Sequence, residues 1–164
     1  MDKLLLILFL LGGLFVLISY IYIFGYMEPG AYLTHPFWLT LPRRIVILFT
    51  VFQIFAAVGF CIGTIHWIAN TPTTGVFGNH PWLLPLTLGI FLIGSSIWAP
   101  ATYFNHRVVS VGSLIVVAVA SILLLAGAVE ETPTRPIIVL SWMAVCIVTV
   151  ICDAIVWNAK YMTI

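Results

Sequence analysis

The sequence carries very little charge. Only 7% of its 164 residues are Asp, Glu, Lys or Arg, whereas a soluble domain carries about 25%. Six basic residues stand against five acidic ones, so the formal net charge is +1, and this balance excludes a basic surface for nucleic acid. The shortage of charge therefore excludes an ordinary soluble domain and indicates a protein that is surrounded by lipid.

The motifs of common enzyme sites are also missing. The sequence contains no G-x-S-x-G nucleophile motif, no phosphate-binding loop and no zinc signature. Its cysteines, Cys61, Cys146 and Cys152, fall inside apolar segments without disulfide or metal-ligand spacing, so we expect buried free thiols. The histidines are divided between the two expected membrane interfaces, and no pair of them is expected to face a haem. These absences make an enzyme the least supported class.

Long apolar runs, by contrast, dominate the chain. Hydrophobic residues make up 63% of it, and the mean hydropathy is +1.21. Crossing about 30 Å of hydrocarbon takes roughly 20 helical residues, and five runs are long enough: 4–26, 45–69, 82–104, 108–129 and 137–157. The first run is longer than the roughly 7–15 residues of a signal-peptide core and lacks an A-x-A cleavage site, so we interpret it as an uncleaved helix. We predict an all-α integral membrane protein in which residues 1–164 form one bundle of five transmembrane helices in a lipid bilayer.

The distribution of basic residues predicts the orientation. Lysine and arginine collect on the cytoplasmic side of membrane proteins. The side that holds the C-terminus has four of them and the opposite side has two: Arg43, Arg44, Arg107 and Lys160 against Lys3 and Arg135. We therefore predict a multi-pass protein with its N-terminus outside and its C-terminus in the cytoplasm, while the kind of membrane stays open.

Two further segments bear on packing. The spacing Gly59-x-x-x-Gly63 in the second run is typical of membrane helices that approach each other closely. The connection at 27–41 is aromatic and apolar, although it belongs to the predicted cytoplasmic side. We expect this connection either to cover the mouth of the bundle or to run along the membrane interface.

The fifth run contains a carboxylate, Asp153. At helical spacing it shares a stripe with polar and aromatic residues, namely Trp142, Cys146, Thr149, Trp157 and Lys160. Such a stripe faces protein or a cavity, because a carboxylate in hydrocarbon costs at least a few kcal/mol. Asp153 lies about 24 Å along the helix from Ile137, near the predicted cytoplasmic end. Two hypotheses remain. Asp153 either clamps the fifth helix to its neighbours, through an ion pair with Arg43, Arg107 or Lys160 or through a hydrogen bond to backbone, or it is a polar group in a ligand pocket that the 27–41 connection closes.

Four short segments resemble a known family. HPFW at 35–38 is similar to its K-P-x-W, with histidine in place of lysine, and IFAAVGFC at 54–61 is similar to its L-Y-x-x-M-G, with Phe55 in place of the tyrosine. WAPATYF at 98–104 is similar to its W-x-P-x-F-F, and DAIVWN at 153–158 is similar to its N-x-x-x-W, with Asp153 where asparagine is usual. In these segments and in its five spans the chain resembles the translocator protein family, also called the tryptophan-rich sensory proteins. It departs from the family in the third helix, where IGSSIW at 93–98 replaces the expected Q-x-x-x-N.

The resemblance implies a membrane receptor-like protein that binds an apolar planar ligand, a porphyrin or a sterol, among its helices. Together with the stripe it implies these ligand-binding residues: Trp38, Phe55, Trp98, Trp142, Thr149, Asp153 and Trp157. The tryptophans would supply stacking surface, and Asp153 would supply the polar group that such pockets carry.

Two other functions stay open at this point. A chain with short loops also suits a structural or accessory subunit of a larger membrane complex, and a homodimer is a further possible assembly. A proton or ion conductor that uses Asp153 is the second alternative, but conductors usually need more than one intramembrane ionisable group, and the apolar runs contain one.

Overall fold

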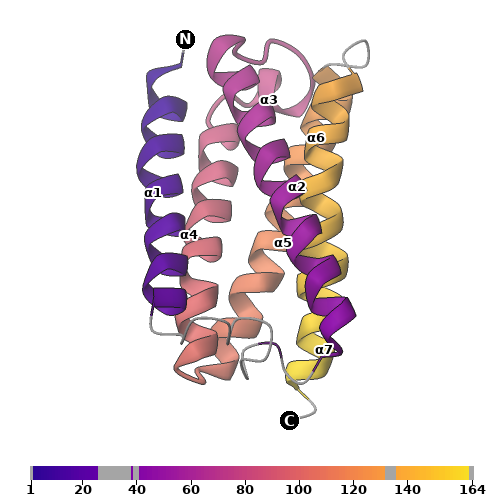
Figure 1. Cartoon of the computed structure of the whole chain (residues 1–164). Helices are drawn as coiled ribbons and strands as arrows, with labels where there is room; N and C mark the ends of the chain where they lie inside the picture. Colours follow the sequence, from indigo (N-terminus) through magenta and orange to yellow (C-terminus); the bar gives the residue numbers. More distant parts are fainter. Residues whose placement is uncertain (1, 26–37, 39–40, 132–135, 163–164) are drawn as a thin grey trace.

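The protein is described by a computed structural model that covers residues 2–25, 38, 41–131 and 136–162. Its elements are α1 (Lys3–Gly25), α2 (Arg43–Ala69), α3 (Gly75–Asn79), α4 (Leu83–Tyr103), α5 (Arg107–Glu131), α6 (Pro136–Cys146), η3 (Ile147–Trp157) and α7 (Asn158–Tyr161). The long helices run side by side, and the two chain ends lie at opposite ends of the bundle (Figure 1). We call these the N-terminal end and the C-terminal end.

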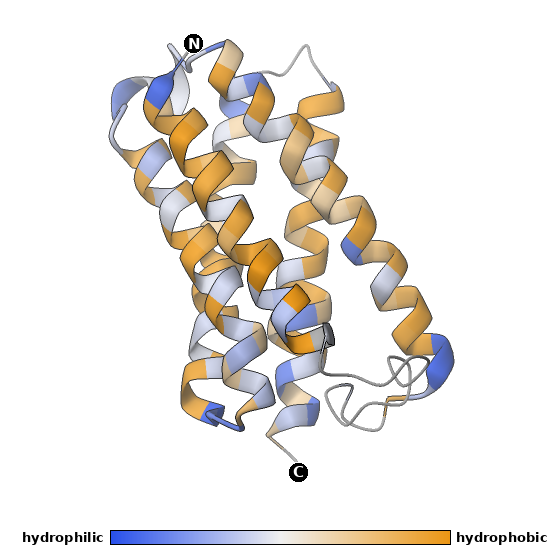
Figure 2. Ribbon diagram, turned by 60° about the vertical axis from the view of Figure 1, so that its left-hand side comes forward, coloured by the Kyte–Doolittle hydropathy of each residue, from blue (hydrophilic) through white to orange (hydrophobic). Residues whose placement is uncertain are grey.

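The predicted fold class is confirmed. Within the described ranges, five helices are long and apolar enough to cross a membrane: Lys3–Ile23, Arg43–Ala69, Leu83–Tyr103, Arg107–Glu131 and Pro136–Tyr161. The last of these combines α6, η3 and α7, so the fifth helix continues four residues beyond the predicted end at position 157. The most hydrophilic parts of the ribbon lie mainly towards the two ends of the bundle (Figure 2).

The helices differ in how much of their surface the bundle covers. Only 11% of the most apolar window of α1 is buried, compared with 44% in α4, in α5 and in the fifth span. Accordingly α1 packs mainly against α4, and its other faces carry exposed leucine and isoleucine side chains. The helix α1 is therefore peripheral, whereas α4, α5 and the fifth span form the centre of the bundle.

Glycines let α2 approach α6 closely. A Cβ atom added to Gly59 would lie 2.5 Å from the backbone oxygen of Ser141, and one added to Gly63 would collide with the indole of Trp142. The predicted role of the Gly59-x-x-x-Gly63 spacing is thus confirmed, because neither position has room for a side chain. This contact fixes the upper half of α2, which crosses the bundle obliquely (Figure 1).

The fifth span changes its helix type half-way along. After α6 ends at Cys146, η3 is a π-helix of 11 residues. At its end the backbone N–H of Asn158 donates to the carbonyl oxygen of Asp153, five residues earlier. A turn of π-helix holds more residues than a turn of α-helix, so side chains four residues apart keep a common face for longer. Thr149, Asp153 and Trp157 are all buried as a result.

The predicted stripe on this span is wrong at two positions. Cys146 is only partly buried and Lys160 is exposed, while Val145 and Tyr161 occupy the buried face instead. Lys160 follows the π-helix, whose spacing alters which residues share a face with Trp142, whereas Cys146 precedes it in α6 and lies at the edge of the buried face.

The expectation of buried thiols holds only for Cys152. Cys61 is exposed on the outer face of α2.

Candidate functional site

Aromatic side chains form a first cluster at the N-terminal end. Trp67 stacks on Trp142 with ring centroids 4.8 Å apart, and Phe77 meets Trp67 edge to face at 5.5 Å. Phe60 joins the group through an edge contact of 5.9 Å with Trp142. We call these residues the N-terminal aromatic cluster. It connects α2, α3 and α6, and Trp67 and Trp142 are almost completely buried in it.

A second aromatic cluster lies at the C-terminal end. Trp98 and Trp157 meet edge to face with centroids 5.7 Å apart, and Tyr161 lies 4.5 Å from Trp157. Tyr20 of α1 contacts Trp98 at 6.0 Å. We call these four residues the C-terminal aromatic cluster. It connects α1, α4 and the end of the fifth span, and both of its tryptophans are buried.

The structure does not bring the predicted tryptophans into one site. Trp142 and Trp157 are fifteen residues apart on the same span, on the order of 20 Å, and each belongs to a different cluster. Trp98 and Trp157 are in contact, whereas Trp142 packs against Trp67 and Gly63. A single stacking pocket of all the predicted tryptophans is therefore not formed.

The remaining predicted residues have different surroundings. Phe55 is 62% exposed on the outer face of α2, so its match to the family motif does not place it among the other residues. Trp38 is buried in the hydrophobic core, and its carbonyl oxygen accepts a hydrogen bond from the N–H of Leu41 at 2.9 Å. Apart from these two positions, the 27–41 connection and its predicted covering role lie outside the described residues.

Thr149 uses its hydroxyl group within the bundle. Its Oγ1 lies 2.6 Å from Oγ of Ser121 on α5 and 3.0 Å from the carbonyl oxygen of Val145. A similar hydroxyl pair joins α4 to α5, where Thr102 and Ser110 are 2.7 Å apart. Hydroxyl groups in hydrocarbon pair with each other or with helix carbonyls because no water is there. Thr149 thus connects η3 to α5 just above Asp153.

Asp153 is the exceptional member of the site. The residue is only 8% exposed, yet its carboxylate forms no hydrogen bond and no ion pair with the residues that the structure describes. Among the described residues, no ion pair joins the Asp153 carboxylate to Arg43, Arg107 or Lys160, and no hydrogen bond joins it to a backbone group. The guanidinium of Arg107 instead lies 5.7 Å from the centroid of the Tyr161 ring. A buried carboxylate without a partner is costly, so the ion-pair clamp does not account for it.

The turn between α4 and α5 closes the C-terminal end. Asn105 has a positive φ of 57° there, a conformation that asparagine tolerates better than most residues. Its Oδ1 accepts a hydrogen bond from the hydroxyl of Tyr161 at 3.2 Å. This bond holds the last turn of the fifth span against the α4–α5 turn, below Trp157 and Asp153.

A pair of glutamates at the N-terminal end of the bundle makes contacts that the sequence does not predict. Oε2 of Glu131 accepts a hydrogen bond from the indole N–H of Trp67 at 2.6 Å, and Oε2 of Glu130 accepts one from the N–H of Val76 at 2.7 Å. The two carboxylates tie the end of α5 to α2 and α3. The sequence shows only two adjacent acidic residues beside a loop, and their partners are 64 and 54 residues away.

The Glu131 contact yields a testable prediction. Glu131→Gln keeps an acceptor for the Trp67 indole but removes the charge, so we expect the free energy of unfolding to fall by about 1 kcal/mol. In a protein that already carries Trp67→Phe, Glu131→Gln should leave the free energy of unfolding unchanged, because the indole donor is absent. Unfolding of both single variants and the double variant in detergent measures the coupling, and additive losses would contradict the bond.

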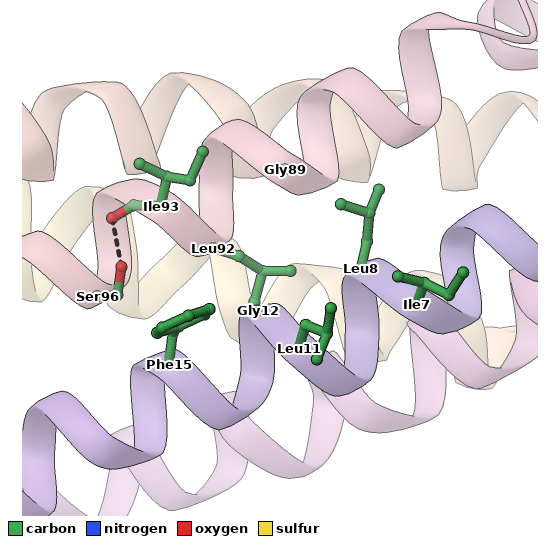
Figure 3. A pocket seen from close by; sticks show the side chains of 9 residues that line it. All are labelled: Ile7, Leu8, Leu11, Gly12, Phe15, Gly89, Leu92, Ile93 and Ser96. Carbon is green, nitrogen blue, oxygen red and sulfur yellow. Dashed lines mark hydrogen bonds between the residues drawn. The ribbon is translucent and has the colours of Figure 1, made fainter.

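An apolar groove lies between α1 and α4, with a volume of about 220 Å³. Figure 3 shows the nine residues that line it, among them Leu8, Gly12 and Leu92. The hydroxyl of Ser96 points to the carbonyl oxygen of Ile93 at 2.8 Å, so it is already bonded within the helix. The groove offers an apolar wall without a polar group to orient a ligand, and the predicted site residues lie elsewhere.

The strongest candidate site is thus the C-terminal aromatic cluster together with Asp153. It combines large aromatic surfaces with the buried Asp153, whose carboxylate forms no hydrogen bond or ion pair with a described residue. In comparisons with known proteins, no family model, no curated protein and no solved structure matches the chain, so the resemblance to the translocator protein family stays a prediction.

Proposed function

We propose that this is a membrane receptor-like protein that binds an apolar ligand beside the C-terminal aromatic cluster, with Asp153 as the polar contact. The observation that carries the proposal is the buried side chain of Asp153, for which no hydrogen bond or ion pair is found within residues 2–25, 38, 41–131 and 136–162. Polar groups inside membrane proteins are costly and are commonly functional. A ligand that donates a hydrogen bond to Asp153 would recover part of that cost.

The surroundings of Asp153 support the proposal. Trp157 follows it by four residues on the buried face of η3, and Trp98 approaches Trp157 from α4. Indole rings offer wide, flat, apolar surfaces to a planar ligand. In addition, α2 packs mainly against α6 and much less against η3, so it covers the Asp153 half of the fifth span less than the other half.

The ligand class in this proposal is a sterol or a porphyrin. Both are large, flat and apolar, and both carry a polar group at one edge. The resemblance of the four short segments to the translocator protein family supports this choice. A site near the end of the span also suits such ligands, because their polar edge then lies towards the membrane interface.

Asp153→Asn tests the proposal. Asparagine has nearly the same size but no charge, so we expect the dissociation constant of the bound ligand to change about tenfold, or about 1.4 kcal/mol. The melting temperature should stay the same or rise, since the carboxylate has no ion-pair partner that the change would leave unpaired. Titration of the purified protein with a sterol and with a porphyrin, together with thermal melting in detergent, measures both quantities.

Asp2→Asn is the matched control. Asp2 caps α1 at the other end of the bundle, where its Oδ1 accepts hydrogen bonds from the N–H groups of Leu4 and Leu5 at 3.0 and 3.2 Å. Asparagine caps helices about as well, so ligand binding should be unaffected. A large drop in melting temperature for Asp153→Asn with unchanged binding would refute the ligand site and restore the clamp.

We further propose that the N-terminal end faces the outside of the membrane. Arg43, Arg44, Arg107 and Lys160 are all exposed at the C-terminal end, and positive residues favour the cytoplasmic side. Asn79→Cys and His106→Cys, each introduced into a protein whose native cysteines are replaced, should react with a membrane-impermeant thiol reagent from opposite sides. Labelling of His106→Cys from the outside of intact cells would reverse the assignment.

A further inference from the structure

A second unpaired acceptor lies one helical turn beyond Asp153. Asn158 is only 5% exposed, and its side-chain oxygen Oδ1 is buried without a hydrogen-bond partner in the structure. Buried amide groups are normally hydrogen-bonded, so an unpaired one calls for an explanation. Asp153 and Asn158 are thus two buried polar residues on the same half of the fifth span, and neither side-chain oxygen of Asp153 nor Oδ1 of Asn158 has a hydrogen bond from a described residue.

The π-helix accounts for their common position. In an α-helix, residues five apart are rotated by about 140° and so face different directions. Here the N–H of Asn158 donates to the carbonyl oxygen of Asp153. Residues joined by such a bond are separated by a little more than one π turn, so the rotation between them is much smaller than in an α-helix. Both side chains are consequently on the buried side of the span.

The side-chain oxygens of Asp153 and Asn158 indicate which kind of polar group a ligand would need. The unpaired side-chain oxygen of Asn158 is a hydrogen-bond acceptor, and the carboxyl group of Asp153 has an acceptor oxygen whether it is ionised or neutral. We propose that Asp153 and Asn158 together bind the hydrogen-bond-donating end of an apolar ligand, a hydroxyl group or a protonated amine. This inference rests on the function proposed above and narrows its ligand class. A ligand whose polar end only accepts hydrogen bonds leaves the Asn158 oxygen unpaired, and one with a negative charge is repelled by that oxygen and by an ionised Asp153.

A series of closely related ligands tests the inference. The full-length protein in detergent is titrated with a 3-hydroxysterol, its 3-methyl ether, the 3-ketone and the 3-amine, which share one apolar body. We expect the alcohol and the amine to bind at least tenfold more tightly than the ether and the ketone. The ratio of amine to alcohol then shows which donor the site prefers. A porphyrin with free propionate groups should likewise bind more weakly than its dimethyl ester.

Variants of Asn158 connect the preference to the site. Asn158→Leu removes the acceptor, so we expect the advantage of the alcohol over the ether to shrink several-fold, whereas Asn158→Gln should keep it. Asn79→Leu is the control, because Asn79 is exposed at the opposite end of the bundle. If Asn158→Leu does not fold, the ligand series on the native protein still decides the question.

The outcomes separate this inference from the proposed function. Equal binding of the alcohol, the ether and the ketone would leave the ligand site standing but overturn the donor requirement. Tighter binding of the ketone, or of the porphyrin with free propionates, would also overturn it, because the site would then favour an acceptor or an anion. Absence of binding by every ligand would refute the proposed function itself.

Discussion

Trp142→Ala should lower the free energy of unfolding by about 3–5 kcal/mol, the usual loss when a large aromatic side chain is removed from a core. Trp142 is completely buried and stacks on Trp67 with centroids 4.8 Å apart. Its ring also contacts Phe60 and fills the space that Gly63 leaves on α2. The cavity would therefore open at the contact between α2 and α6. Denaturation of the purified protein in mixed detergent micelles measures the loss.

Trp82→Ala is the matched control for this prediction. Trp82 is 62% exposed, and its ring contact with His80 has centroids 6.4 Å apart. The same chemical change there should alter the free energy of unfolding by no more than about 0.5 kcal/mol. Equal losses for the two variants would show that Trp142 does not belong to the core.

Gly59→Ala should lower the free energy of unfolding by about 1–3 kcal/mol, the usual cost of overpacking. The new methyl group would lie 2.5 Å from the backbone oxygen of Ser141. A backbone atom cannot rotate away as a side chain can, so α2 and α6 must separate. The stacking of Trp67 on Trp142 would loosen with them, and the change in their near-ultraviolet circular dichroism reports it.

Gly13→Ala, in contrast, should raise the free energy of unfolding or leave it unchanged. No atom lies within 4 Å of a Cβ added at Gly13, and alanine favours a helix by about 1 kcal/mol over glycine. Comparing the two substitutions separates helix propensity from packing. A loss of stability at Gly13 as large as at Gly59 would mean that helix contacts do not decide these effects.

The fold could be predicted from the sequence because the bilayer imposes it. Hydrocarbon leaves helices as the only way to satisfy the backbone of each apolar run, and the run lengths then give the helix ends. Gly59 and Gly63 also predicted a close helix contact, although the sequence could not say that Ser141 and Trp142 are the partners. Which helices become neighbours depends on three-dimensional packing that the individual runs do not encode.

The site was only partly predictable for a related reason. Asp153 stands out in any membrane helix, and its burial with Trp157 followed from the stripe. The exposure of Lys160 could not be predicted because the change from α-helix to π-helix before it has no periodic signal of its own. Phe55 was predicted to bind the ligand because it matches a family motif. A motif identifies a residue type, but it does not determine on which face of α2 the residue lies.

The separation of the tryptophans into two clusters gives the molecule two independent optical signals. Trp67 and Trp142 are stacked at one end, and Trp98 and Trp157 are in edge contact at the other. Neighbouring indoles couple their electronic transitions, and the two geometries couple them differently. The ends of the bundle therefore have distinct spectra, and the order in which they open during unfolding can be followed without attaching any label.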